Sequence, residues 1–372
     1  MPLYLPAAIG MPLADVDTPA LILELDAFEG NLRRMQQSLA GRRVKLRPHA
    51  KSHKCPEIAL RQIALGAVGV CCQKVSEAEA LVDGGVADVL IANEVVGAVK
   101  LKRLAALAKR ARLAVCADNA DNIKALDAAA SELGIELDVL VEINVGANRC
   151  GVEPGEAAVK LARQIAASAN LRFGGLQAYH GSAQHVRKVA ERRAAIESAV
   201  GHVKRTRELL DAAGIACPKV TGAGTGTYLF EAASAVYDEL QAGSYIFMDA
   251  DYARNDWTES GIPRFEHSLF VWTTVMSRTT AERAIVDAGL KASSIDSGMP
   301  RIADGGPAEY VKASDEHGVI QLNGAPGYAI GDKLKLIPGH CDPTVNLYDH
   351  YICMRNGRVE AIWPITARGA VW

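Results

Sequence analysis

The stretch Val44-Lys45-Leu46-Arg47-Pro48-His49-Ala50-Lys51-Ser52-His53-Lys54 begins like a buried strand and ends in a cluster of nitrogen bases. Val44 and Leu46 alternate with polar neighbours, and Pro48 lacks the N–H that a further ladder hydrogen bond requires. A lysine such as Lys51, close to other cations and partly removed from water, is expected to have a lowered pKa and to be nucleophilic. A solvated basic loop is the alternative interpretation of this cluster.

A repeating pattern of strands and helices surrounds this stretch. Apolar, strand-like runs recur eight times, at 44–48, 68–73, 88–93, 113–118, 137–144, 173–180, 219–222 and 239–247. Helical segments rich in Ala, Leu, Glu and Lys lie between most of them. The alternation predicts an α/β fold with a parallel sheet, and eight units favour closure into a (β/α)8 barrel over 26–253. An open, doubly wound sheet is the alternative.

The pattern changes after about residue 253. The segments 267–277, 283–290, 333–338 and 351–364 are strand-like and show almost no helical periodicity. Asn356-Gly357 predicts a two-residue hairpin turn inside the last of them. We therefore expect a second, mostly β domain over 254–372, joined by an N-terminal strand within 14–25.

Composition argues against several classes of function. The 372 residues carry 41 basic and 43 acidic side chains, a net charge of -2, which gives no support for binding nucleic acid or a membrane surface. The N-terminus lacks the pattern of a signal peptide, and no apolar run approaches the roughly 20 residues of a membrane span. Eight scattered cysteines without a C-x-x-C pair indicate reduced thiols in a cytoplasmic protein.

Polar residues follow the predicted strands at the end where a barrel carries its active site. Lys51 follows the first strand, Gln73 ends the second, and Arg149 lies in the loop after the fifth. Tyr179 and His180 end the sixth strand. Each could be structural when taken singly, and their convergence on one rim is what favours a site.

Small residues follow the last two strands of the predicted barrel. The seventh leads into Gly222-Ala223-Gly224-Thr225-Gly226-Thr227, and the eighth contains Gln241-Ala242-Gly243-Ser244-Tyr245. Backbone N–H groups and hydroxyls of such loops make an anion cradle, and barrels often bind phosphate in these two places. A phosphate site opposite a reactive lysine implies a phosphorylated aldehyde, and pyridoxal 5'-phosphate (PLP) fits that description.

The segment Pro338-Gly339-His340-Cys341-Asp342-Pro343-Thr344 follows a strand of the second domain. If it is extended, His340 and Asp342 point the same way and Cys341 is turned aside. Imidazole with carboxylate suits Mg²⁺ or Mn²⁺, whereas a thiolate would favour zinc. A surface turn is the alternative interpretation.

Five motifs together resemble the D-threonine aldolases, which belong to the alanine-racemase-like PLP enzymes with the 3-hydroxy-D-aspartate aldolases and D-serine dehydratases. The motifs are Arg47-Pro48-His49-Ala50-Lys51-Ser52-His53-Lys54, Val70-Cys71-Cys72-Gln73-Lys74-Val75-Ser76-Glu77-Ala78, Ala178-Tyr179-His180-Gly181, Asp287-Ala288-Gly289-Leu290-Lys291 and 338–344. The resemblance runs from about Asp17 to Arg368. It implies a PLP-binding barrel with a β domain.

The resemblance also implies a function. This is retro-aldol cleavage of D-β-hydroxy-α-amino acids to glycine and an aldehyde, which depends on PLP and a divalent metal. A 3-hydroxy-D-aspartate aldolase, releasing glyoxylate, is the main alternative; His53, Lys291 or Arg187 could then bind the second carboxylate. The dehydratases carry cysteine where this chain has Asp342, which argues against D-serine dehydration. Fold relatives form dimers, so a homodimer is expected.

Roles for individual residues follow from the same resemblance. Lys51 would form the Schiff base with PLP, Arg149 would face its phenolic oxygen, and Gln73 and Tyr179 would line the ring. Thr225, Gly243 and Ser244 would hold the phosphate, beside Gly224 and Tyr245 in the same two loops. His340 and Asp342 would bind Mn²⁺ or Mg²⁺, and His180 would be the base near the substrate hydroxyl.

Overall fold

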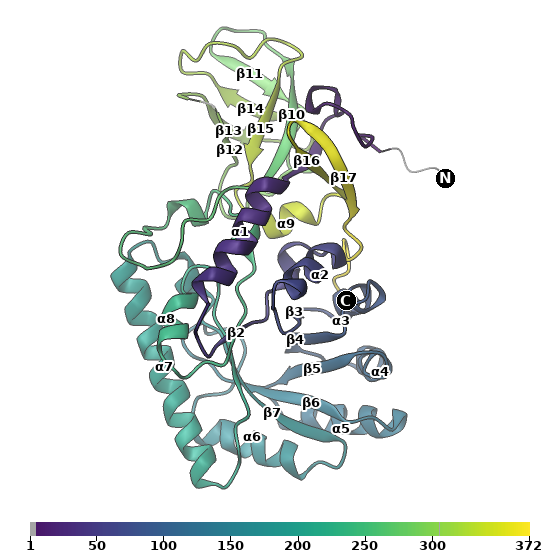
Figure 1. Ribbon diagram of the computed structural model, residues 1–372, viewed down its shortest axis with the longest axis vertical. Helices are drawn as coiled ribbons and strands as arrows, with labels where there is room; N and C mark the ends of the chain where they lie inside the picture. The colour runs from purple at the N-terminus through teal and green to yellow at the C-terminus, as the bar shows by residue number, and fades with distance from the viewer. Residues whose placement is uncertain (1–4, 305) are drawn as a thin grey trace.

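Two sheets organise the chain in the computed structural model, which describes residues 5–304 and 306–372 (Figure 1). The first sheet has eight parallel strands in the order β2-β9-β8-β7-β6-β5-β4-β3. Its strands are β2 (Lys45–Leu46), β3 (Val70–Cys72), β4 (Asp88–Glu94), β5 (Arg112–Ala117), β6 (Leu137–Glu142), β7 (Leu171–Ala178), β8 (Val220–Gly222) and β9 (Glu239–Leu240).

The two ends of this strand order meet, so the sheet is a closed barrel. His49 and Cys71 form a parallel bridge just beyond β2, and the Cys71 N–H donates to the carbonyl of Pro48 at 2.9 Å. Pro48 ends its strand as expected, and its carbonyl still accepts across the seam. The predicted barrel is confirmed, and the alternative of an open sheet is wrong.

Amphipathic helices cover the outside of the barrel. They are α2 (Pro56–Ala64), α3 (Val75–Asp83), α4 (Ala98–Leu107), α5 (Ala120–Leu133), α6 (Glu156–Ala167), α7 (Val189–Ala212) and α8 (Tyr228–Ala233). The ends of α5 show why such segments form: the Asn119 side chain accepts from the N–H groups of Asp121 and Asn122, and Gly134 ends the helix in the left-handed conformation at φ 62°. Both devices satisfy backbone groups that a helix end leaves unpaired.

The inside of the barrel is filled in layers of different polarity. A small apolar cluster of Cys71, Leu90, Ala92, Cys116 and Leu140 lies within it. The barrel is therefore a packed core, and its polar inward residues lie toward the two ends, where strands leave the apolar cluster.

The second sheet is mostly antiparallel and contains the N-terminal strand, as expected. Its strands are β1 (Ala20–Glu24), β10 (Leu269–Ser277), β11 (Arg283–Val286), β12 (Arg301–Ile302), β13 (Glu309–Ala313), β14 (Gly318–Gln321), β15 (Lys333–Ile337), β16 (His350–Arg355) and β17 (Arg358–Pro364). β1 pairs antiparallel with β10 and parallel with β16. Asn356 and Gly357 join β16 to β17 with φ values of 51° and 73°, as a two-residue hairpin requires. The domain boundary at 254 stays a prediction.

Helix α1 (Leu25–Ser38) runs from the second sheet along the barrel (Figure 1). Asn31, fully buried in this helix, donates to the carbonyls of Ile246 at 3.1 Å and Glu266 at 2.7 Å, and accepts from the Glu266 N–H at 2.8 Å. One side chain thus fixes α1 to the end of the barrel segment and to the chain that enters β10.

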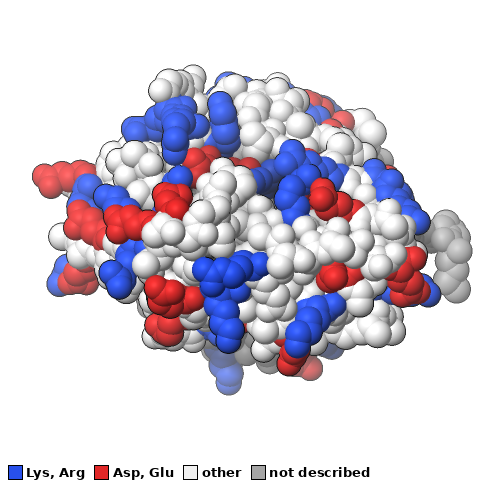
Figure 2. Space-filling model, turned by 90° about the horizontal axis from the view of Figure 1, so that it is seen from below, with Lys and Arg blue, Asp and Glu red and all other residues white. Residues whose placement is uncertain are grey.

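The surface carries both signs of charge. Figure 2 shows Lys and Arg interspersed with Asp and Glu over the face it presents. No helix within the described residues combines the length and apolarity needed to cross a bilayer.

Arg47 provides a test of the barrel's charged end. Its buried guanidinium donates to Glu239 Oε2 at 2.7 Å and to Asp88 Oδ1 at 2.7 Å. Arg47→Met removes the buried guanidinium that bonds both carboxylates and leaves only the more exposed Lys219 at Glu239 and Arg112 at Asp88, so the free energy of unfolding should fall by about 3–5 kcal/mol in urea denaturation. Arg112→Met is the matched control, because the Arg112 guanidinium is 62% exposed and 3.8 Å from Asp88; it should cost less than about 1 kcal/mol. Equal stability of the two variants would contradict this account.

Candidate active site

A cavity lies at the C-terminal end of the barrel strands, where the second sheet contributes the short helix α9 (Cys341–Val345). Ten of the twelve predicted site residues line it, and these are Lys51, Gln73, Arg149, Tyr179, Gly224, Thr225, Gly243, Ser244, His340 and Asp342. Residues from distant parts of the chain therefore meet in one place, as the strand-end pattern predicts. Tyr245 and His180 are not among the lining residues.

Lys51 lies in a short 3-10 turn, η2 (Ala50–Ser52), directly after the strand that Pro48 ends. Its Nζ is 3.5 Å from Asp342 Oδ2. Burial alone would lower the pKa of Lys51, and Arg149 adds to that effect, but Asp342, together with Tyr179, outweighs both and the pKa is raised. The expectation of a lowered pKa is therefore wrong for the protein alone. It counted only the neighbouring cations and not a carboxylate from the other end of the chain.

His49 supports Lys51 from behind. Its buried ring accepts the Lys51 N–H at Nδ1, at 3.3 Å, and its Nε2 lies 2.8 Å from the amide nitrogen of Gln73. Burial first, and then the charge of Lys51, hold the pKa of His49 well below its usual value, so the ring is neutral at pH 7. His49 is thus a neutral side chain in a fixed position, and it accepts a hydrogen bond from the backbone N–H of Lys51.

The two glycine-rich loops form another part of the cavity wall, and other groups approach them so closely that glycine is required. A Cβ on Gly224 would lie 2.5 Å from Gln184 Oε1, and one on Gly243 would lie 2.9 Å from the His49 carbonyl oxygen. Thr225 Oγ1 accepts the N–H of Tyr245 at 3.1 Å and so joins the two loops. The result is a cradle of small side chains and hydroxyls.

Tyr245 contributes its backbone to this cradle, but its side chain points elsewhere. Its hydroxyl accepts from Gln62 Nε2 at 3.0 Å, and its ring packs beside Phe265 at 5.6 Å between centroids. The residue is fully buried outside the cavity. The side chain of Tyr245 lies outside the cavity because the chain turns into a 3-10 helix at Ser244–Ile246, so only its backbone remains as a candidate for binding the cofactor.

His340 and Asp342 both line the cavity, although the segment is not extended as expected. His340 immediately precedes α9, and Asp342 lies in the first turn of that helix. Buried Asp249 holds the turn, because its Oδ2 accepts the N–H of Cys341 at 3.2 Å. Cys341 itself is fully buried, and burial raises the pKa of its thiol well above the usual value. A thiolate ligand is thereby disfavoured.

This pair has the properties of an incomplete cation site. Asp342 Oδ1 is buried and has no hydrogen-bond donor in the described chain. His340 Nδ1 lies 2.8 Å from Asp296 Oδ2. Burial would lower the pKa of His340, but Asp342 and Asp296 outweigh it and raise the pKa. No cluster of three or more His, Cys, Asp or Glu side chains within 5–304 and 306–372 could hold a metal alone, so water or substrate would have to complete the coordination.

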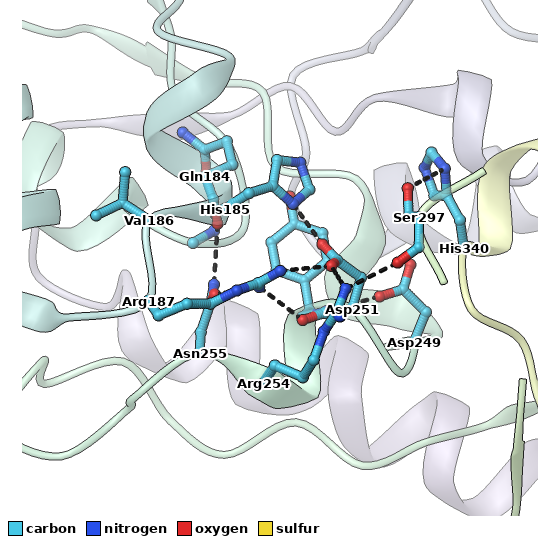
Figure 3. Close-up of polar contacts among 12 residues, drawn as sticks. Gln184, His185, Val186, Arg187, Asp249, Asp251, Arg254, Asn255, Ser297 and His340 are labelled. Atoms are coloured by element: carbon cyan, nitrogen blue, oxygen red, sulfur yellow. Dashed lines mark hydrogen bonds and ion pairs between the residues drawn. The ribbon is translucent and has the colours of Figure 1, made fainter. Parts of the chain in front are cut away.

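A second histidine that the sequence did not single out faces the cavity (Figure 3). His185 belongs to η3 (Ser182–His185), and its Nδ1 lies 2.5 Å from Asp251 Oδ2. Its ring packs beside that of Tyr252, with 5.3 Å between centroids. Burial would raise the pKa of Asp251, but hydrogen bonds from Arg187, Arg254 and His185 hold it below its usual value. Asp251 is therefore an anion that fixes the orientation of His185.

His180, the base expected from the sequence, lies beside this cavity rather than in its wall. A Cβ on Gly146 would be 2.6 Å from His180 Nε2, and the His180 Nδ1 is 3.3 Å from Ser182 Oγ. The strand-end rule selected His180 because it follows β7 directly. The turn η3 then brings His185 to the cavity. The sequence signal for this was a second histidine five residues after His180.

The three residues considered as partners of a second substrate carboxylate are already paired, uncharged or outside the cavity. Arg187 Nη2 donates to Asp251 Oδ1 at 2.6 Å. His53 is fully buried, and burial lowers its pKa to about 3, so it carries no charge at pH 7. Lys291 pairs with Glu316 at 2.5 Å and does not line the cavity.

Comparison with known proteins places this geometry in a family. The alanine racemase N-terminal domain matches residues 23–251, and a putative serine dehydratase domain matches 268–354. The chain is 50% identical to a D-threonine aldolase of Arthrobacter sp., over 98% of this chain and 96% of that one. It is 47% identical to a 3-hydroxy-D-aspartate aldolase of Paracoccus denitrificans, over 98% and 95% of the two chains.

A solved structure agrees with these sequence matches. The crystal structure of D-threonine aldolase from Filomicrobium marinum superposes with a TM-score of 0.97 at 54% identity, covering 99% of this chain and 100% of that one. The similarity therefore includes both sheets and the cavity between them.

Proposed function

This chain belongs to the family of D-threonine aldolases and 3-hydroxy-D-aspartate aldolases, which are aldehyde-lyases, and we propose that it cleaves D-β-hydroxy-α-amino acids of the D-threonine type to glycine and an aldehyde. One observation carries the proposal: an amine, an anion cradle and an imidazole-carboxylate pair line a single cavity. PLP and a divalent metal are the groups that such a cavity would take.

The residues present fit PLP. The Lys51 amine would bind its aldehyde, and the cradle of Thr225, Gly243 and Ser244 would bind its phosphate. Gln184 packs closely against Gly224 and His49 against Gly243, so a side chain at either glycine would collide with them. When bound, PLP accepts the electron pair that is released as the Cα–Cβ bond breaks.

The residues also fit a hard divalent cation. His340 and Asp342 would hold Mn²⁺ or Mg²⁺, because the unpaired Asp342 oxygen offers a ligand and Cys341 is turned away into the core. The cation would polarise the substrate hydroxyl and lower its pKa. Asp296 at His340 Nδ1 orients the imidazole, as partners of metal-binding histidines commonly do.

We assign the proton transfer to His185. Its Nδ1 lies 2.5 Å from Asp251 Oδ2, so the carboxylate orients the ring, and Nε2 is the nitrogen that would accept a proton. A base in that position can take the proton of the substrate hydroxyl as the Cα–Cβ bond breaks. Asp251, Arg187 and Arg254 hold the ring in place (Figure 3).

A neutral group on the β-carbon suits this cavity better than a second carboxylate. Of the three residues considered, His53 is uncharged, Lys291 lies outside the cavity, and Arg187 is already paired with Asp251. We further propose a cytoplasmic homodimer; the eight unpaired cysteines support the reducing location.

Glycine release is the direct test of this function. Purified protein with PLP and Mn²⁺ should release glycine and acetaldehyde from D-threonine, and more slowly glycine and glyoxylate from D-3-hydroxyaspartate; EDTA should stop both. Lys51→Ala should lower turnover by at least roughly a thousandfold, because the amine that binds the cofactor is lost. Exposed Lys45 provides the control, since Lys45→Ala should retain activity. Faster cleavage of D-3-hydroxyaspartate would favour the alternative substrate, and pyruvate from D-serine would favour dehydration.

Asp342→Ala should act mainly through the metal. Loss of one of two protein ligands should raise the Mn²⁺ concentration for half-maximal activity by at least about 10–100-fold, in a titration of EDTA-treated protein. Asp349→Ala is the control, because Asp349 pairs with Arg368 outside the cavity. An Asp342→Ala enzyme that keeps full activity in chelator would remove the metal role.

The two histidines can be separated by the same substitution. His185→Gln should lower kcat for D-threonine by roughly 10²–10⁴, the usual contribution of a general base, whereas His180→Gln should change it little. Steady-state rates at saturating metal and cofactor provide the comparison. The reverse order would return the role of base to His180.

A further inference from the structure

Two glutamates lie inside the barrel beneath the cavity, outside the machinery described so far. Glu142 is the last residue of β6, and Glu94 is the last residue of β4. Glu142 is only 4% exposed. Glu142 Oε2 and Glu94 Oε1 are both buried and find no hydrogen-bond donor in the described chain. A hydrogen bond with Glu94 is among the causes that raise the pKa of Glu142, and two carboxyl groups can share such a bond only if one of them carries a proton.

The surroundings favour one shared proton. Burial, followed by the charge of Glu94, raises the pKa of Glu142 to about 8. Cys116 of β5, Asp118 after β5 and Cys150 after β6 also face this pair, and none of them is a cation. Glu142 therefore holds a proton at neutral pH, because a buried carboxyl group next to other carboxylates ionises with difficulty.

Arg149 is the cation that lies beside this pair. Its Nη2 lies 3.8 Å from Glu142 Oε1, and its guanidinium carbon lies 5.8 Å from the centroid of the Tyr179 ring. The side chain is 51% exposed, so neither contact is enclosed. Its charge reaches into the cavity, since it lowers the pKa of both Lys51 and His49.

We propose that Glu142 is a positioning residue which, by sharing one proton with Glu94, holds Arg149 at the cavity wall and keeps its charge directed toward Lys51. A doubly ionised pair would draw the guanidinium toward the barrel interior, and an apolar residue would leave it free in solvent. The inference rests on the proposed binding of PLP to Lys51.

The first experiment measures the affinity of the cofactor-free protein for PLP at pH 7 by absorbance titration. Glu142→Ala removes the support of Arg149 and should weaken binding roughly 3- to 10-fold. Glu142→Gln imitates the protonated acid and should bind within about threefold of wild type. Asp138→Asn is the matched control, because Asp138 lies on the same strand at the opposite end, where it accepts from Arg172.

The same titration in an Arg149→Met background shows whether Glu142 acts through the arginine. There Glu142→Ala should cause no further loss, because its partner is already absent. An equal loss in both backgrounds would mean that Glu142 merely supports the strand, and would overturn the inference.

The second experiment follows the visible absorbance of lysine-bound PLP against pH. Wild type should show an inflection near pH 8 as the shared proton leaves, and Glu142→Gln should lack it. Glu94→Gln should move the inflection at least roughly one pH unit lower, because a lone Glu142 ionises more easily. An inflection that persists in Glu142→Gln would overturn the role of the pair. A wild-type protein that binds no PLP would instead overturn the proposed function itself.

Discussion

Closure of the parallel sheet between Pro48 and Cys71 is the constraint on which the rest of the structure depends. A closed barrel leaves polar groups only at its two ends, since its strands are buried on both sides and packed within by small apolar residues. It also aligns the carboxyl ends of all eight strands. Lys51, the glycine loops and Arg149 meet for that reason, although they are spread over two hundred residues of chain.

The second sheet supplies what the barrel alone lacks. Asn31 hydrogen-bonds α1 to Ile246, at the end of the barrel segment, and to Glu266, just before β10. Asp249 fixes the start of α9 by accepting the N–H of Cys341. These buried polar contacts determine where His340 and Asp342 stand relative to Lys51. A side chain that bonds backbone groups of two distant segments specifies their relative position more sharply than apolar packing does, because its geometry is directional.

The sequence predicts site residues well where the side chain lies at or just after the end of a strand. Gln73 directly follows β3 and Tyr179 directly follows β7, and both line the cavity. Lys51 lines it as well, from the short turn η2 that begins soon after its strand. The expected positions are less accurate for His180 and Tyr245: His180 lies beside the cavity while the 3-10 turn η3 brings His185 to it, and the side chain of Tyr245 is buried outside it. Such turns depend on tertiary contacts, as between Asn255 and the Gln184 carbonyl, which no local pattern contains.

For the proposed metal pair, His340 and Asp342 meet at the cavity as expected, but the expected extended backbone is wrong. Alternation along an extended strand was the argument for His340 and Asp342, yet the segment is a helix start. The Lys51 pKa was misjudged for a related reason, since Asp342 approaches from the far end of the chain. Sequence patterns report neighbours along the chain, whereas pKa values depend on neighbours in space.

The two ends of the barrel differ in whether their buried charged groups are paired within the chain. At the N-terminal end, Arg47 donates to both Asp88 and Glu239, so the buried charges are paired. At the cavity end, acceptor oxygens of Asp342, Glu142 and Glu94 remain without donors in the described chain. Buried polar groups are costly when unpaired and are normally satisfied. Their retention beside a lysine and an arginine is explained if protons, a cation and a cofactor complete this end of the barrel, while the opposite end is complete in the folded chain itself.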